Sequence, residues 1–89
     1  MSVGPLAALR ARFIERTRQD GDALETAFRS GDDAVVEHLA HNLAGAAGVF
    51  GFGDLGDAAR AIDHAYAAGE RPSSEAVTDL RQRILDLQA

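Results

Sequence analysis

The 89-residue chain contains no cysteine, so neither a disulfide framework nor a thiolate metal site can form. Packing of the core must therefore supply the stability of this small chain. The N-terminal sequence MSVGPLAALRARF has no basic region followed by a long apolar core, so it does not predict a secretory signal. The longest nearly uncharged stretch, residues 42–53, is too short to cross a bilayer. We therefore expect a soluble cytoplasmic protein that does not contact a membrane.

The sequence also lacks a basic stripe with interleaved aromatic residues. Its nine basic residues are scattered among 14 acidic ones, and the formal net charge is −5. This distribution argues against nucleic acid as a partner. A hydrophobic fraction of 46% and a charged fraction of 26% are typical of a globular chain, and the length predicts one domain over residues 1–89.

Strand signals are absent as well, and the first half of the chain is strongly helical in pattern. Residues 5–30 form either one long helix kinked near Gly21 or two helices in line, with Pro5 at the first helical position. Gly31 is expected to stop this segment, and Asp32 can cap the next helix. The apolar residues near one face of the segment are Leu6, Leu9, Phe13, Leu24 and Phe28.

Three further helices are predicted, at about 33–50, after the GFGD turn, and after the AGERPSS loop. Asp54 is expected to cap the third helix, and Ser73 or Ser74 the fourth. The predicted buried faces are Val36, Leu39, Ala40, Leu43, Ala47 and Phe50; then Leu55, Ala58, Ala59, Ile62, Ala65 and Tyr66; then Val77, Leu80, Ile84, Leu85 and Leu87. Four amphipathic helices with short connections indicate an all-α, antiparallel up-and-down four-helix bundle.

The stretch HNLAGAAGVFG, residues 41–51, places glycines beside a histidine within a helical pattern. With Leu43 at the centre of the buried face, His41 lies about 160° away and points to solvent. The same outer face carries Ala34, His38, Gly45 and Gly48, with Glu37 and Ala44 at its edges. Such a bare surface lets a bulky partner approach the ring, which makes the cost of each glycine, about 1 kcal/mol, tolerable.

An exposed imidazole is mostly neutral at pH 7, and its nitrogen is a good nucleophile toward an activated phosphoryl group. No second catalytic group is placed beside His41, so the pattern favours a carrier whose partner supplies the catalysis. Two alternatives remain. The HLAH sequence with nearby Glu37 suggests a metal-binding bundle, although such bundles direct their ligands inward. A helical adaptor or dimerisation module could exchange the segment around Gly21 between chains.

Residues 39–63, LAHNLAGAAGVFGFGDLGDAARAID, resemble the core of histidine-containing phosphotransfer (HPt) domains. The family pattern is histidine, any residue, leucine, lysine and glycine, then small residues, a later glycine, and a third helix that ends in a leucine-acid pair. The matching residues are His41, Leu43, Gly45, Ala47 and Gly51, with Leu55 and Asp63 at the expected distances. The resemblance extends over about residues 13–66.

This resemblance implies that His41 accepts a phosphoryl group on its outward Nε2. The donor would be an aspartate of a response-regulator receiver domain or a histidine-kinase relay, and the acceptor another receiver aspartate. The receiver would contribute an acidic pocket and Mg²⁺, so this chain would need no cofactor or metal of its own and would be a carrier, not an enzyme. We expect a monomer whose docking surface surrounds His41 and includes His38, Ala44, Gly45 and Gly48.

The chain departs from the family pattern at Ala44, where the usual lysine helps to balance the charge of phosphohistidine. Another cation can serve in its place, and His38 and Arg60 are the candidates. Alternatively, the phosphohistidine is less stable, or the domain is an inactive adaptor that docks a receiver without transfer.

Overall fold

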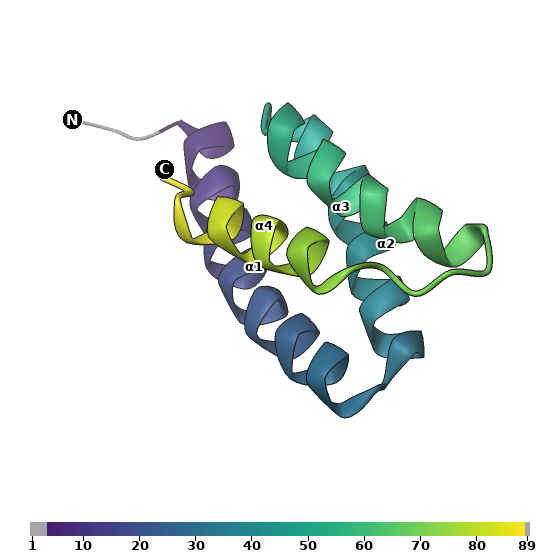
Figure 1. The fold of residues 1–89 in the computed structure, drawn as a ribbon. Helices are drawn as coiled ribbons and strands as arrows, with labels where there is room; N and C mark the ends of the chain where they lie inside the picture. The colour runs from purple at the N-terminus through teal and green to yellow at the C-terminus, as the bar shows by residue number, and fades with distance from the viewer. Residues whose placement is uncertain (1–3, 89) are drawn as a thin grey trace.

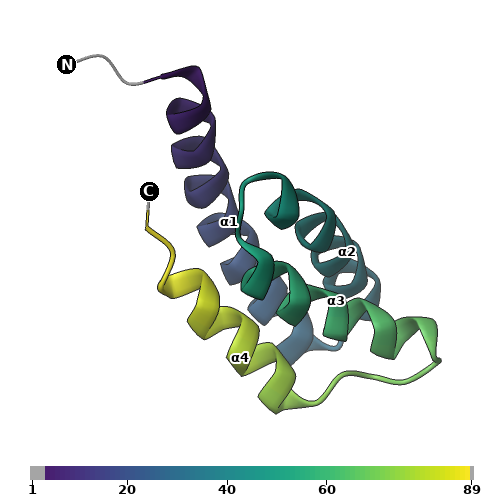
Figure 2. The same cartoon turned by 90° about the horizontal axis from the view of Figure 1, so that it is seen from above.

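The computed structural model describes residues 4–88, which form four α-helices with short connections (Figure 1). They are α1 (Pro5–Ser30), α2 (Asp33–Val49), α3 (Gly53–Ala67) and α4 (Ser74–Leu85). α2 packs against α1 and α3, and α4 packs against α3 and α1, so the helices close into a bundle (Figure 2). The predicted all-α four-helix bundle is confirmed. None of the helices formed by residues 4–88 is long and apolar enough to span a membrane.

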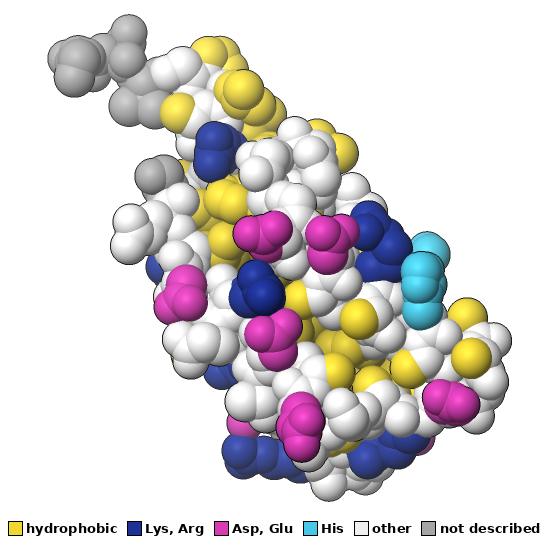
Figure 3. All heavy atoms as spheres, turned by 45° about the horizontal axis from the view of Figure 1, so that its top comes forward, with side chains coloured by type: hydrophobic (Ala, Val, Ile, Leu, Met, Phe, Trp, Pro, Cys, Tyr) yellow, Lys and Arg dark blue, Asp and Glu magenta, His cyan; other side chains and the backbone are white. Residues whose placement is uncertain are grey.

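α1 is one continuous helix, which ends where Gly31 adopts the left-handed conformation at φ +76°. Its first turns extend beyond the other helices (Figure 2). Leu6 and Leu9, which the sequence pattern places near one face of the helix, are consequently 63% and 51% exposed. Figure 3 shows apolar side chains on the surface at this end of the molecule.

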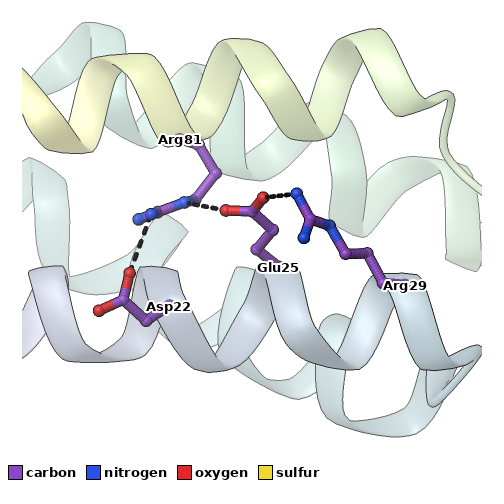
Figure 4. Close-up of polar contacts among 4 residues, drawn as sticks. All are labelled: Asp22, Glu25, Arg29 and Arg81. Atoms are coloured by element: carbon purple, nitrogen blue, oxygen red, sulfur yellow. Dashed lines mark hydrogen bonds and ion pairs between the residues drawn. The ribbon is translucent and has the colours of Figure 1, made fainter.

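Gly21 lies in the middle of α1 and is buried, because α4 crosses α1 closely at this point. A Cβ atom here would lie 2.8 Å from Arg81 Nη1 and 3.0 Å from Ile84 Cδ1. Arg81 reaches from α4 to two carboxylates of α1, at 2.9 Å from Asp22 and 2.8 Å from Glu25 (Figure 4). The glycine thus serves the packing of α1 on α4.

Two of the predicted helix caps are present. The Asp32 carboxylate accepts a hydrogen bond from the Val35 backbone N–H, and the Ser73 hydroxyl accepts one from Ala76. The prediction that Asp54 caps α3 is wrong, because Phe52 occupies the N-cap position and no side chain caps this helix. Asp54 lies instead in the first turn, where its charge favours the helix dipole.

The connection between α3 and α4 is fastened to the start of α2. The Tyr66 hydroxyl donates a 2.8 Å hydrogen bond to Asp33 Oδ1, and Arg71 Nε donates to the same oxygen at 3.0 Å. Burial and the bond to Asp33 raise the pKa of Tyr66 to about 12. The hydrogen bonds from Tyr66 and Arg71 lower the pKa of Asp33. The guanidinium of Arg71 also lies 4.1 Å from the centroid of the Phe28 ring.

The core lies along the centre of the bundle and takes residues from all four helices. Leu85 is the exception to the predicted buried faces, at 58% exposed. Ile84, in the last turn of α4, and Leu87, just beyond the end of the helix, are both buried in the core, whereas Leu85 points outward. The buried apolar residues are Ile14, Leu24, Ala27, Val36, Ala40, Leu43, Ala47, Leu55, Ala59, Ile62, Val77, Leu80, Ile84 and Leu87.

Candidate functional site

His41 projects from the middle of α2, and 72% of its side chain is exposed. Its Nδ1 lies 3.1 Å from Oδ2 of Asp63 on α3. An ionised carboxylate can only accept a hydrogen bond, so this contact requires the ring proton on Nδ1. In that tautomer Nε2 keeps a free lone pair, and it has no hydrogen-bond partner among residues 4–88. The imidazole is therefore both oriented and accessible.

Close packing of α3 on α2 sets the position of Asp63. A Cβ atom at Gly56 would lie 3.4 Å from Ala47 Cβ and 3.5 Å from the Ala44 carbonyl oxygen, so the two helices approach closely here. α2 and α3 run in opposite directions, so a position further along α3 faces an earlier position of α2. Asp63, two turns after Gly56 on α3, therefore contacts His41, which precedes Ala47 on α2. Gly56 and Asp63, seven residues apart, lie on one stripe of α3 that faces α2.

The surface of α2 beyond His41 has almost no side chains. Gly45 and Gly48 are both exposed, and a Cβ atom built at either position would meet no neighbouring atom within 4 Å. Neither glycine is required by helix packing or by a positive φ angle. The structure thus agrees with the sequence-based interpretation that this face is left open around the histidine.

A shallow hollow beside His41 contains His38, one turn earlier on α2. His38 Nε2 lies 3.1 Å from the side-chain nitrogen of Asn42. The amide nitrogen can only donate, so Nε2 accepts in this arrangement. The hollow is lined by Ala34, Glu37, His38, His41 and Asp63.

The described residues offer no metal centre at this site. Within residues 4–88 there is no group of three or more His, Cys, Asp or Glu side chains that could hold a metal ion. His38 and Glu37 lie near His41, but both are exposed on the outer face of α2 and do not converge with ligands from several helices. The geometry therefore gives no support to the metal-binding alternative.

The structure brings together most of the residues that the sequence singled out. His38, Gly45 and Gly48 are exposed on the His41 face, while Ala44 is half-buried toward α3. The contact between His41 and Asp63 was not anticipated. The only sequence signal for it is an acidic residue on the α2-facing stripe of α3, and using that signal requires the register between the two helices.

Comparison with known proteins agrees with this geometry. A family model described as the Hpt domain matches residues 8–89. The chain belongs to the Hpt domain family. Hpt domains take part in histidine phosphotransfer within phosphorelays, where they are phosphoryl carriers, not enzymes, and their partners are receiver domains. No curated protein and no solved structure matches the chain significantly.

Proposed function

We propose that this Hpt domain carries a phosphoryl group on Nε2 of His41. The observation that carries the proposal is the 3.1 Å contact between His41 Nδ1 and Asp63, which leaves Nε2, on an exposed ring, without a partner among residues 4–88. The open surface at Gly45 and Gly48 gives a large phosphodonor room to approach. A nucleophile that is oriented and accessible is what transfer between two macromolecules requires.

The transfer step can be written with this chain's own groups. The Nε2 lone pair attacks the phosphorus atom of an aspartyl phosphate, the N–P bond forms, and the P–O bond breaks with its electrons retained by the leaving carboxylate. The proton on Nδ1 stays in place, so the ring becomes positively charged. Asp63 accepts the Nδ1 hydrogen bond throughout and stabilises that charge. The reverse step returns the phosphoryl group to a second aspartate.

The partners we propose are a response-regulator receiver domain on each side of the transfer and a histidine kinase upstream. Phosphoryl transfer depends mainly on positioning and on stabilising charge, and a receiver that brings Mg²⁺ can supply both to a passive carrier. The receiver would contact the open surface of α2. The residues of this docking surface are His38, Ala44, Gly45 and Gly48, arranged around His41.

The decisive experiment is intact-mass analysis after incubation with a phosphorylated receiver domain and Mg²⁺. We expect one added phosphate that is labile in acid and stable in base, as phosphohistidine is. His41→Gln should abolish the adduct, whereas His64→Gln, which removes another exposed histidine, should keep it. Both variants should retain the circular dichroism of the wild type, because both side chains lie on the surface.

A different result would point to the inactive adaptor. If the folded wild-type protein accepted no phosphate from several receivers yet bound one of them, phosphotransfer through His41 would be rejected. The domain would then act by docking alone.

A further inference from the structure

The charge around His41 is unfavourable for a phosphoryl group. Such a group carries roughly two negative charges at neutral pH. Asp63 contacts the same ring, Glu37 lines the adjoining hollow, and no arginine lines that hollow. The sequence contains no lysine, and the second histidine of the hollow, His38, is already bonded to Asn42 through Nε2. A stable phosphohistidine therefore needs a cation from elsewhere in the chain.

The packing of α3 on α2 places Arg60 of α3 near the level of His41 along the bundle. Gly56 lies against Ala44 and Ala47, and Asp63 lies against His41. Arg60 falls between these two contacts along α3, about one turn from each of Gly56 and Asp63, so it lies at a level between Ala44 and His41. Ala44 is small and cannot fill the space between the helices at this level. A long side chain from α3 can therefore extend over it toward the ring.

Arg60 is free to change its partner. Its Nη1 donates to Asp57 Oδ1 at 2.7 Å, but the two side chains are 49% and 73% exposed. Ion pairs of this kind, one turn apart on an exposed helix, are weak. A phosphoryl group carries more negative charge than the Asp57 carboxylate and has three acceptor oxygens, so it is the stronger ligand for the planar guanidinium. Figure 3 shows acidic, basic and histidine side chains following one another on one face of the molecule.

We propose that Arg60 binds the phosphoryl group on His41, leaving Asp57 when the histidine becomes phosphorylated. This inference rests on the proposed phosphotransfer function and names the residue that balances the charge of the product. Asp57 then acts as a competing partner, which holds the guanidinium in the unphosphorylated state.

The test compares Arg60→Gln with Arg83→Gln. Arg83 is a matched control, because it also forms an exposed ion pair one turn along its own helix, with Asp79 on α4. Each protein is phosphorylated with phosphoramidate and then mixed with an unphosphorylated receiver and Mg²⁺. At equilibrium we expect Arg60→Gln to hold roughly three- to tenfold less phosphate relative to the receiver, since a charge-assisted hydrogen bond is lost. Arg83→Gln should match the wild type, and Arg60→Lys should recover part of the loss.

Phosphorus NMR of the phosphorylated proteins provides a readout that a purely structural role would not change. Removing a cation disfavours the dianion, so the titration midpoint of the phosphoryl group should move to higher pH in Arg60→Gln. Asp57→Asn, which frees the guanidinium, should move it the other way. If Arg60→Gln matched Arg83→Gln in both measurements, the role of Arg60 would be rejected while phosphotransfer stood. A wild-type protein that accepts no phosphate on His41 would overturn both proposals.

Discussion

At the scale of single residues, the contact with Asp63 decides which nitrogen of His41 carries the ring proton. Replacing it by asparagine keeps the shape but removes the charge, and an amide can donate as well as accept. Asp63→Asn should therefore populate both ring tautomers and slow phosphotransfer roughly five- to tenfold, in line with a lost charge-assisted hydrogen bond of about 1 kcal/mol. The transfer rate from a phosphorylated receiver measures the loss, and nitrogen NMR shifts of the His41 ring report the tautomer.

The control for this variant is Asp54→Asn, which removes an exposed carboxylate from the first turn of α3. It should transfer phosphate at the wild-type rate. An Asp63→Asn protein with an unchanged rate and an unchanged tautomer would show that Asp63 does not orient the ring.

The positions of His41 and Asp63 were not equally predictable from the sequence. The exposure of His41 follows from its phase on α2 relative to Leu43, which is a local property of the sequence. Its contact with Asp63 joins residues 22 positions apart and depends on how closely α3 packs at Gly56. That approach is a tertiary property, so the sequence predicted an exposed histidine at this position but not the carboxylate that contacts it.

At the scale of the helix, α2 gives up stability to keep its surface open. Gly45 has no neighbour within 4 Å of a Cβ position, so Gly45→Ala should fit without strain. It should raise the free energy of unfolding by about 0.5–1 kcal/mol, because alanine favours the helix over glycine. Gly45→Trp should also fold, but its bulk should block the approach of a receiver to His41. Thermal unfolding measures the first effect and the rate of phosphate acceptance the second.

Comparing these two variants separates access from stability. Gly45→Ala should accept phosphate at nearly the wild-type rate, since one methyl group leaves Nε2 exposed. Normal transfer by Gly45→Trp would mean that receivers do not dock over this face of α2.

Helix boundaries show a similar division between local and tertiary causes. The caps at Asp32 and Ser73 were predictable, because each side chain bonds to a backbone N–H three residues later. At α3 the N-cap residue is Phe52. Its carbonyl oxygen accepts a hydrogen bond from the Gly56 N–H, so the helix begins before Asp54. The periodicity of α1 likewise places Leu6 and Leu9 near one face of the helix. It does not show how far along α1 the other helices cover that face.

At the scale of the whole molecule, long-range polar contacts hold the helices in register. Arg81 ties α4 to α1 through Asp22 and Glu25, and Glu25 also pairs with Arg29 at 2.6 Å (Figure 4). Arg71 and Tyr66 tie the α3–α4 connection to Asp33 at the start of α2. The second set lies two turns from His41 along α2, so it anchors the end of the helix that carries the proposed phosphoacceptor.

Alkaline titration tests this anchor directly, because Tyr66 is the only tyrosine and the chain has no tryptophan. The pKa of Tyr66 is raised from 10.0 to about 12 in the folded protein, first by burial and then by the hydrogen bond to Asp33. Since the folded protein favours the protonated hydroxyl, the stabilisation is complete below pH 10 and is lost as pH rises from 10.0 to about 12. Absorbance of the tyrosinate should therefore appear well above the ordinary range.

Two variants test the causes and the consequence of the raised pKa of Tyr66. Asp33→Asn should lower the pKa of Tyr66 only part of the way toward 10.0, because burial of the ring remains the larger contribution. In the wild type, deprotonation of Tyr66 lowers the free energy of unfolding between pH 10.0 and about 12. Tyr66→Phe has no hydroxyl to titrate, so this part of the pH dependence should disappear. A tyrosine that titrates at its ordinary pKa in the folded wild type would mean that Tyr66 is neither buried nor bonded to Asp33, and that Arg71 alone fastens the connection to the start of α2.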